Sequence, residues 1–405
     1  MLTVEPAVRK RRSRRRIALA LAGGGPLGAF YQLGCLHALT ECTQGLDLAK
    51  LDGYVGVSSG AIIAAALANG ITTQEMVRLF FVDDGTDSSP LTPGVLMRPA
   101  LGEYVGRAVR APKLAAQVLK RLAGDPLGQN WAGLLSPLVH AIPTGIFDNR
   151  PFEKYLRTLL TRSGRTNDFR KVPAFLRIVA TDLNSGCEVR FGEPGHDRVP
   201  ISEAIRASTA LPGLYTPVRI GRHTYVDGAL LRTVHASLVL DNGADLVISV
   251  NPLVTFDASR ARGGHRHDLA GDGLIAVVGQ TFRALIQSRM QIGMAAYRDR
   301  YPLSDRLLFE PDRDDEVMFF TNVFRYAERR RLANHAYQQT RRDLLQAADK
   351  LSPALRRHGV TLRFDRLNDA ARTFDACVPA AHFKTAVTAG LGATLQQLSD
   401  WMAVH

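Results

Sequence analysis

Four apolar runs in the first 250 residues predict the buried strands of a parallel sheet. Strands that are covered on both faces carry continuous apolar residues rather than an alternation of apolar and polar ones. The runs are Ile17–Ala22, Tyr54–Val57, Ala174–Asp182 and Leu246–Val250. Because stretches with apolar residues at helical spacing separate them, the pattern predicts an α/β fold with a mostly parallel central sheet.

Smaller elements are predicted between these strands. Glu188–Phe191 alternates like an edge strand, and Val218–Asp227 is typical of a hairpin that turns at Gly221. Asp227 would then end the second hairpin strand, and strand ends on one edge of an α/β sheet are where catalytic groups gather. Helical spacing predicts four helices, at Thr72–Phe81, Pro151–Leu160, Ile201–Ser208 and Val234–Leu240.

Residues 82–143 are predicted to be a helical insertion. Turn residues mark its beginning, and Leu101–Leu122 is a basic amphipathic stretch. Two interpretations fit equally well. The insertion is either a lid or interface-binding element of an enzyme with hydrophobic substrates, or a flap packed on the sheet with its cationic groups in water.

The chain beyond residue 255 is predicted to be mainly helical. Amphipathic patterns cover Leu269–Arg298, Tyr326–Leu351 and Ala381–Trp401, with a short strand at Arg306–Phe309. We therefore divide the chain into a tail (1–16), a sheet-containing domain (17–255) and a C-terminal region (256–405).

Two glycine-rich turns follow the first two strands and carry the candidate chemistry. In Gly56–Gly60, the pattern Gly-x-Ser-x-Gly lies between an apolar run and an alanine-rich helix, which is the context of a nucleophile elbow. Gly56 and Gly60 would let strand and helix approach closely, and the helix N-terminus would favour an anion beside the Ser58 hydroxyl. A plain loop is the alternative reading.

The other turn, Gly23–Gly28, also joins a strand to a helix. Its backbone N–H groups would serve as an oxyanion hole, which needs donors and no side-chain chemistry. A pyrophosphate cradle is disfavoured because the spacing is not that of a dinucleotide-binding turn with a ribose-binding acid downstream. A purely structural turn stays open.

The net charge of +13 is concentrated at the N-terminus. Residues 1–16 contain seven basic residues and one acid, Glu5, and so contribute +6. We expect a disordered basic tail, with attraction to anionic lipid headgroups as the sharper alternative. Nucleic-acid binding is not expected, because no groove of interleaved aromatic and basic residues follows.

The sequence predicts a cytoplasmic protein, at most peripheral on the inner face of a membrane. Ile17–Ala22 is too short for a secretory signal, and no apolar run approaches the ~20 residues of a membrane span. A metal site at His265 and His267 is not expected, because no other ligand type is clustered there. Four scattered cysteines are expected to be reduced thiols: Cys35, Cys42, Cys187 and Cys377.

Three ordered blocks, Gly23–Gly28, Gly56–Gly60 and Asp227–Ala229, resemble the signature of the patatin-like phospholipase family. The likeness covers roughly residues 17–255 and implies a three-layer α/β sandwich with a helical lid, acting without metal or cofactor. Connecting segments match as well, at Gly145–Asp148, Ala180–Gly186, Ala207–Gly213 and Gly243–Asp245.

The resemblance implies a catalytic dyad in which Asp227 accepts the proton of Ser58 directly. The family usually has Arg or Lys where this chain has Leu27, so a charge beside the oxyanion hole is absent while its backbone donors remain. The implied oxyanion donors are Gly23, Gly24 and Gly25, and the glycines that support the motifs are Gly28, Gly56, Gly60 and Gly228.

A Ser–Asp–His triad is the competing mechanism. The α/β-hydrolase order places the histidine after the aspartate, where His235 and His265 lie. His223 would share a strand face with Asp227 and is the better candidate for a supporting contact.

The sequence therefore predicts a serine lipid acyl hydrolase of the phospholipase A or lipase type that works at a lipid or membrane surface. An intracellular polyester depolymerase or a thioesterase with the same dyad is the first alternative. A non-catalytic protein that binds membrane or nucleic acid through its arginine-rich tail is the second.

Overall fold

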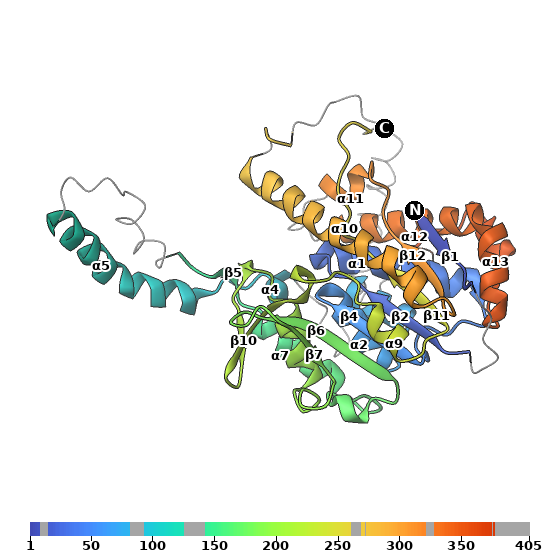
Figure 1. Cartoon of the computed structure of the whole chain (residues 1–405), viewed down its shortest axis with the longest axis horizontal. Helices are drawn as coiled ribbons and strands as arrows, with labels where there is room; N and C mark the ends of the chain where they lie inside the picture. Colours follow the sequence, from blue (N-terminus) through green and yellow to red (C-terminus); the bar gives the residue numbers. More distant parts are fainter. Residues whose placement is uncertain are drawn as a thin grey trace, which may run out of the picture.

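A central sheet organises the protein, seen in a computed structural model that describes residues 1–8, 15–81, 93–124, 142–260, 269–271, 273–320, 328–374 and 376 (Figure 1). The strand order of the described sheet is β1-β12-β11-β2-β4-β6-β10-β9, and β7 pairs with β6 beside this path. The strands are β1 Leu2–Glu5, β2 Ile17–Leu21, β4 Gly53–Val57, β6 Phe175–Asp182, β7 Glu188–Phe191, β9 Val218–Ile220, β10 His223–Asp227, β11 Leu246–Val250 and β12 Asp305–Phe309.

The middle of the sheet is parallel and its margins are antiparallel. Strands β12, β11, β2, β4 and β6 run parallel to one another. At the margins, β1 pairs with β12, and β10 with β6 and β9, in antiparallel fashion. The predicted α/β class and mostly parallel sheet are confirmed.

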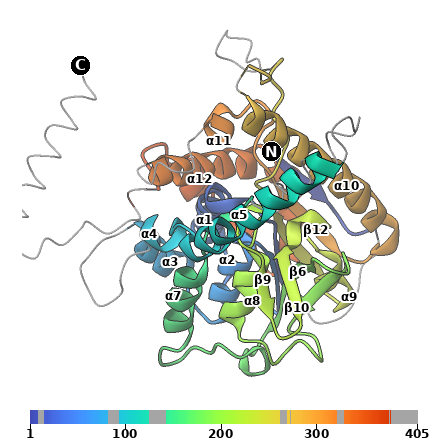
Figure 2. The ribbon, with the colours of Figure 1, turned by 90° about the vertical axis from the view of Figure 1, so that its left-hand side faces the viewer.

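Helices cover both faces of the sheet and complete three layers, as Figure 2 shows with α1, α7 and α12 on one side and α9 and α10 on the other. The first side holds α1 Gly25–Cys42, α2 Ser59–Ala68, α3 Thr73–Phe81, α7 Arg150–Leu160, α8 Ile201–Ser208, α12 Arg329–Gln346 and α13 Ala348–Arg357. The second side holds α9 Ser237–Asp241 and α10 Leu274–Arg300.

Strand β2 shows why the buried strands read as unbroken apolar runs. Its Leu19 and Leu21 belong to the core under α1 and α2, whereas Ala18 and Ala20 belong to the core under α9. Because each face of the strand meets a helical layer, no position along it is left for a polar side chain.

Shorter elements complete the described chain. Two small sheets pair β3 Thr43–Gln44 with β13 Thr361–Leu362, and β5 Gly145–Phe147 with β8 Gly213–Tyr215. The remaining helices are α4 Pro93–Leu96, α5 Leu101–Gly124, α11 Glu316–Phe320, α14 Phe364–Leu367 and the 3-10 turns η1 Phe169–Lys171 and η2 Gly228–Leu230.

The N-terminal segment departs from the predicted disordered tail. Leu2–Glu5 forms β1 because its backbone pairs with β12, and the Met1 ammonium donates to the Glu310 carbonyl at 2.7 Å. Residues 9–14, which hold five of the seven basic residues, lie outside the described ranges.

The C-terminal region is continuous with the sheet domain. Its strand β12 lies between β1 and β11, and its helix α12 packs along α1. The contact is close, since a Cβ added to Gly34 would lie 2.2 Å from the Ala333 carbonyl oxygen. The predicted helix Ala381–Trp401 lies outside the described residues.

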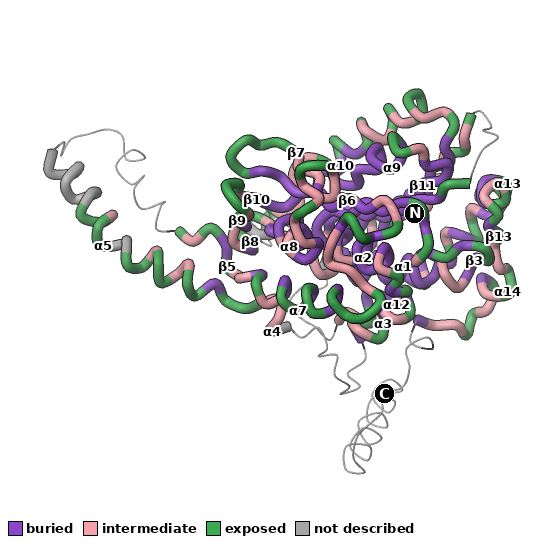
Figure 3. The backbone as a smooth tube through the Cα atoms, turned by 90° about the horizontal axis from the view of Figure 1, so that it is seen from below, coloured by how far each residue is buried: buried purple, intermediate pink, exposed green. Residues whose placement is uncertain are grey.

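Helix α5 projects from the body of the molecule (Figures 1 and 3). Its N-terminal turn is attached to β5, because the Tyr104 hydroxyl donates to the Ile146 carbonyl at 3.0 Å. The alternative of a flap lying on the sheet is therefore wrong for this helix, while a lid remains a prediction. Within the described ranges, none of the helices is both long and apolar enough to cross a bilayer.

Candidate active site

The register of the sheet brings three distant segments to one level. Val57 pairs with Val179 across β4 and β6, so the next residue, Ser58, stands level with Ala180. Ala180 in turn pairs with Asp227 across β6 and β10. On the other side of β4, Leu21 pairs with Gly56, which places Gly23 level with Ser58.

Ser58 occupies a strained turn between β4 and α2. Its φ of 52° lies in the left-handed region, which non-glycine residues adopt only where the surroundings enforce it. The enforcement is close packing: a Cβ on Gly56 would lie 2.5 Å from the Ala61 Cα, and one on Gly60 would lie 2.5 Å from the Leu21 carbonyl oxygen. These glycines therefore allow the sharp bend that the Gly-x-Ser-x-Gly pattern predicted.

Asp227 is held rigidly beside Ser58. It is 2% exposed, and its Oδ1 accepts a hydrogen bond from the Ala229 N–H at 2.9 Å. Burial raises the pKa of the Asp227 carboxyl to about 6, and hydrogen bonding from the Ser58 side chain opposes part of that rise. Gly228 is required next to it, because a Cβ there would lie 2.3 Å from the Val179 carbonyl oxygen.

The glycine turn after β2 lies against the serine. A Cβ on Gly23 would lie 3.1 Å from the Ser58 Cβ, so the backbone passes directly over that side chain. Within the described chain, the amides of Gly24 and Gly25 donate to no protein acceptor, as is usual for the first turn of a helix such as α1. Gly24 is packed against Pro252 and the Gly28 Cα, which fixes the turn. Leu27 packs against the main core and brings no charge to this turn.

Ser208 is a positioning residue that the sequence analysis did not single out. Its Oγ accepts a hydrogen bond from the Ser58 N–H at 2.8 Å and donates to the Val179 carbonyl at 2.5 Å. It therefore ties the elbow to β6. Its only sequence signal is its place in the segment Ala207–Gly213.

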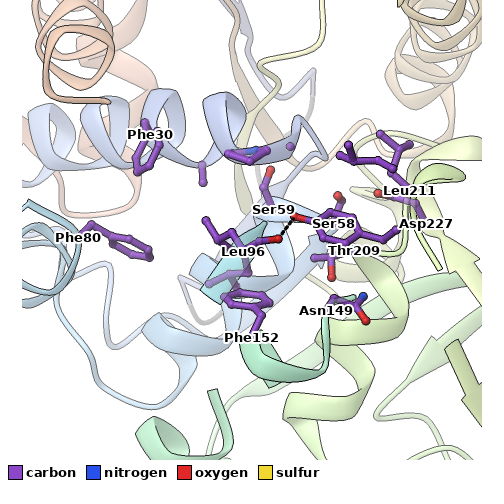
Figure 4. Close-up of a pocket in the computed structure, with 16 residues that line it drawn as sticks. Phe30, Ser58, Ser59, Phe80, Leu96, Asn149, Phe152, Thr209, Leu211 and Asp227 are labelled. Carbon is purple, nitrogen blue, oxygen red and sulfur yellow. Dashed lines mark hydrogen bonds between the residues drawn. The ribbon is translucent and has the colours of Figure 1, made fainter. Parts of the chain in front are cut away.

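A cavity opens from Ser58 and Asp227 into apolar surroundings (Figure 4). Ser58 and Asp227 lie at one end, and Phe30 and Phe80 lie at the other. The cavity measures about 650 Å³, counting the space at its mouth. Its further lining includes Ile62, Leu96, Phe152, Leu211, Leu214 and Tyr215.

Two of the three histidines considered near Asp227 lie in the described residues, and each of the two is beside another acid. The His223 Nδ1 lies 2.7 Å from an Asp182 carboxylate oxygen, so the expected contact of His223 with Asp227 is wrong. His235 is buried near Glu188, with 3.5 Å between Nδ1 and Oε2, and desolvation lowers its pKa to about 4. His265 lies outside the described residues.

Among the residues that the structure describes, no group of three or more His, Cys, Asp or Glu side chains could hold a metal ion. Cys35, Cys42 and Cys187 are free thiols, and Cys377 lies outside the described residues.

An α/β sandwich with a serine elbow at the carboxyl edge of its sheet has the architecture of a hydrolase. The sequence model of patatin-like phospholipases matches residues 19–240 of this chain, which is more than half of it. The chain belongs to the patatin-like phospholipase family.

The matches to curated relatives each cover only part of the relative's own length. An uncharacterized NTE family protein of Mycobacterium tuberculosis is 26% identical over 257 residues, which cover 64% of this chain and 34% of that protein. The uncharacterized protein YqhO of Bacillus subtilis is 26% identical over 44% of this chain and 52% of its own length. The chain thus spans about a third to a half of the length of these relatives.

Two of the solved structures that match this chain share little sequence with it. VipD from Legionella pneumophila matches with 19% identity and a TM-score of 0.32, covering 67% of this chain and 56% of VipD. Human GIVD cytosolic phospholipase A2 matches with 14% identity and a TM-score of 0.34, covering 87% of this chain and 61% of the human chain. Family membership follows from the sequence match alone.

Proposed function

We propose that this protein is a serine lipid acyl hydrolase of the phospholipase A or lipase type, with Ser58 as nucleophile and Asp227 as general base. One observation carries the proposal: the sheet register sets Ser58 and Asp227 at the same level on either side of β6. Both side chains line one apolar cavity, which is the environment that an acyl ester would enter.

In the acylation step, Ser58 Oγ attacks the ester carbonyl carbon while Asp227 takes the hydroxyl proton. The carbonyl oxygen becomes an oxyanion, and the amides of Gly24 and Gly25, with Gly23 beside them, donate to it. The carbon–oxygen bond to the alcohol then breaks, and Asp227 returns the proton to the leaving alkoxide. An acyl-enzyme on Ser58 remains.

In the deacylation step, water attacks the acyl carbonyl and gives its proton to Asp227. The bond to Ser58 Oγ breaks, Asp227 protonates that oxygen, and the carboxylic acid leaves. The same carboxyl group thus serves both halves of the reaction.

The surroundings of Asp227 suit this role. A carboxylate in water is too weak a base for an alcohol, but burial has raised the Asp227 pKa to about 6, which strengthens the base. The second contribution to the rate comes from the amides of the glycine turn, which would stabilise the oxyanion by donating hydrogen bonds to it. In comparable sites, loss of one such donor lowers kcat about 10²- to 10³-fold.

The proposal includes a lipid surface as the partner. The first three turns of α5 expose Leu101, Val105 and Val109, and Lys113 follows on the exposed surface of the same helix. Apolar groups flanked by cations are typical of helices that lie in a membrane interface. A peripheral, cytoplasmic location fits this proposal. A polyester depolymerase or thioesterase with the same dyad stays the alternative.

The decisive experiment is active-site labelling with a fluorophosphonate, followed by mass spectrometry of the modified peptide. We expect label on Ser58 of the wild type, none on Ser58→Ala, and labelling slowed at least 100-fold in Asp227→Asn. Ser59→Ala is the matched control because Ser59 is the adjacent serine and lines the same cavity. It should keep the label.

Two further results would contradict the proposal. Absence of label on the folded wild type would remove the nucleophile, and loss of label in His235→Ala alone would replace the dyad by a triad.

A further inference from the structure

A groove with three cationic side chains lies at the base of α5. It holds about 490 Å³ between the segment that leads into α5 and the first turns of α7. The side chains that give the groove its chemistry are Arg98, Leu101, Asp148, Arg150 and Lys154. We call it the basic groove.

Two of the three cations are not neutralised by an acid. The Arg150 guanidinium is paired with Asp148, and its Nε and Nη2 each lie 2.8 Å from Oδ2. Arg98 and Lys154 are exposed, and within the described chain neither side chain forms an ion pair. Two positive charges in the basic groove are therefore available to a bound anion.

The start of α5 adds a hydrogen-bond donor to these charges. Gly102 lines the groove, and its N–H donates to no acceptor in the part of the chain that the structure describes. The N-terminal end of a helix is positively polarised, so both α5 and α7, which begins at Arg150, favour an anion at this place. A phosphate group makes charge-assisted hydrogen bonds to arginine, lysine and backbone amides alike.

The basic groove adjoins the candidate active site. Leu96 and Asn149 line the cavity there (Figure 4). Arg98 lies two residues beyond the first of them, and Arg150 directly follows the second. The two segments are joined, because the Asp148 N–H donates to the Arg98 carbonyl at 2.8 Å. A ligand in the groove is therefore bound next to the catalytic cavity.

The apolar surface beside the groove favours a lipid over a soluble phosphate. Leu101 lines the groove, is exposed, and begins the apolar face that Val105 and Val109 continue along α5. A soluble anion would leave this face in water. A headgroup in the groove would instead bring the face against the hydrocarbon next to that headgroup.

We propose that the basic groove binds the phosphomonoester headgroup of a bilayer lipid, of which phosphatidic acid is the simplest. This inference rests on the proposed function, from which it takes the lipid surface, and it adds a headgroup class. A phosphomonoester carries about −1.5 to −2 charges at pH 7, which two unpaired cations match better than they match the single charge of a phosphodiester. A lipid held there sets the base of α5, and the cavity beside it, against the membrane.

The test is flotation of the full-length protein with phosphatidylcholine vesicles that contain either phosphatidic acid or phosphatidylglycerol, matched in zeta potential. The protein carries Ser58→Ala throughout, so that binding is measured without hydrolysis. We expect tighter binding to phosphatidic acid. Arg98→Ala and Lys154→Ala should each weaken that binding roughly tenfold and reduce the preference, because each removes a charge-assisted hydrogen bond to the phosphate.

Lys350→Ala is the matched control. Lys350 is an exposed lysine of α13, which lies across the molecule from α5 (Figures 1 and 3). The variant removes the same charge as Lys154→Ala but leaves the groove intact. It should keep the full preference for phosphatidic acid.

Two results would overturn the inference. One is equal binding to the two kinds of vesicle, or a preference that both groove variants retain. The other comes from titration calorimetry with inorganic phosphate: a dissociation constant as low as that for phosphatidic acid, and lost in Arg98→Ala, would assign the groove to a soluble phosphate.

The proposed function is tested separately. If Ser58 takes no fluorophosphonate label, the proposed function fails, while a preference for phosphatidic acid that depends on Arg98 and Lys154 would still establish the headgroup site. Loss of that preference would remove the headgroup site and leave the labelled serine unaffected.

Discussion

At the scale of single residues, burial of the Asp227 carboxylate lowers the free energy of unfolding at neutral pH. Its carboxyl group titrates near 3.8 in an unfolded chain, and burial raises this pKa to about 6 in the folded protein. Between these two pH values the unfolded chain ionises while the folded protein does not, so the free energy of unfolding falls as the pH rises. Above pH 6 both states are ionised, and the full cost of about 3 kcal/mol remains.

We predict from this that Asp227→Asn stabilises the protein at pH 8, by at most about 3 kcal/mol, and has little effect near pH 4. The amide removes the buried charge but keeps an oxygen for the Ala229 N–H. Denaturant unfolding at the two pH values measures the difference. The same titration should make kcat/KM of the wild type fall below a pH of about 6, because the protonated base accepts no proton.

Asp182→Asn supplies a control of opposite sign. The hydrogen bond to His223 is the main interaction that lowers the Asp182 pKa, so its ionised form stabilises the fold at neutral pH and this contribution disappears in acid. The substitution should therefore destabilise the protein at pH 8. An Asp227→Asn variant that is stabilised equally at both pH values would disprove the assignment of the buried charge.

At the scale of elements, the contact between α1 and α12 depends on a missing side chain. Helix α1 is buried almost all round, because the sheet lies on one side and α12 on the other. Gly34 lets the two backbones approach, and its neighbours across the contact are Ala333 and Ala336. The two helices can approach this closely because both have small residues at the contact.

We predict that Gly34→Ala destabilises the protein by about 2 kcal/mol or more, because a backbone carbonyl must move to admit the methyl group. Gly106→Ala is the control: its Cβ would meet nothing within 4 Å, so the substitution should be neutral or stabilise α5 by about 0.5–1 kcal/mol. Urea unfolding of both variants distinguishes them. A Gly34→Ala protein as stable as the wild type would show that the Ala333 carbonyl of α12 is not in direct contact with Gly34.

The elements that the sequence predicted well are those with a local signal. The buried strands, the helix Ile201–Ser208 and the hairpin ending at Asp227 were each predicted within a residue or two, because periodicity and turn residues specify them. Strand β1 was missed because its partner β12 lies 300 residues away and a short half-buried strand has no distinctive pattern. Ser208 was missed, and the contact of His223 was assigned to the wrong acid, for the same reason: their partners come from other strands and helices.

The candidate pair could be predicted from the sequence, since glycine motifs mark both Ser58 and Asp227. Their roles in catalysis remain a prediction that the labelling experiment tests.

At the scale of the whole molecule, the described chain is one body in which the C-terminal region is part of the sheet. Strand β12 covers the edge of β11, and β1 then covers β12. The division at residue 255 therefore separates chain segments that share one hydrogen-bonded sheet. The insertion is tied to the site as well, because Leu96 of α4 lines the cavity and α5 begins five residues later.

This arrangement leads to a prediction about membrane binding. Leu101, Val105 and Val109 repeat every four residues and are 66%, 62% and 74% exposed, so they share one face of α5. Glu103 and Arg107, which form an ion pair, occupy the opposite face. We predict that Val105→Glu and Val109→Glu each weaken binding to anionic vesicles roughly tenfold. Each substitution removes an exposed valine that the membrane would bury, and it adds a negative charge that the anionic lipid repels. Flotation with vesicles containing phosphatidylglycerol measures this binding.

Val278→Glu is the control. It makes the same change at a 57% exposed valine of α10 and should bind as the wild type does. Equal loss in all three variants would show that net charge alone governs binding, and the apolar face of α5 would then have no part in it.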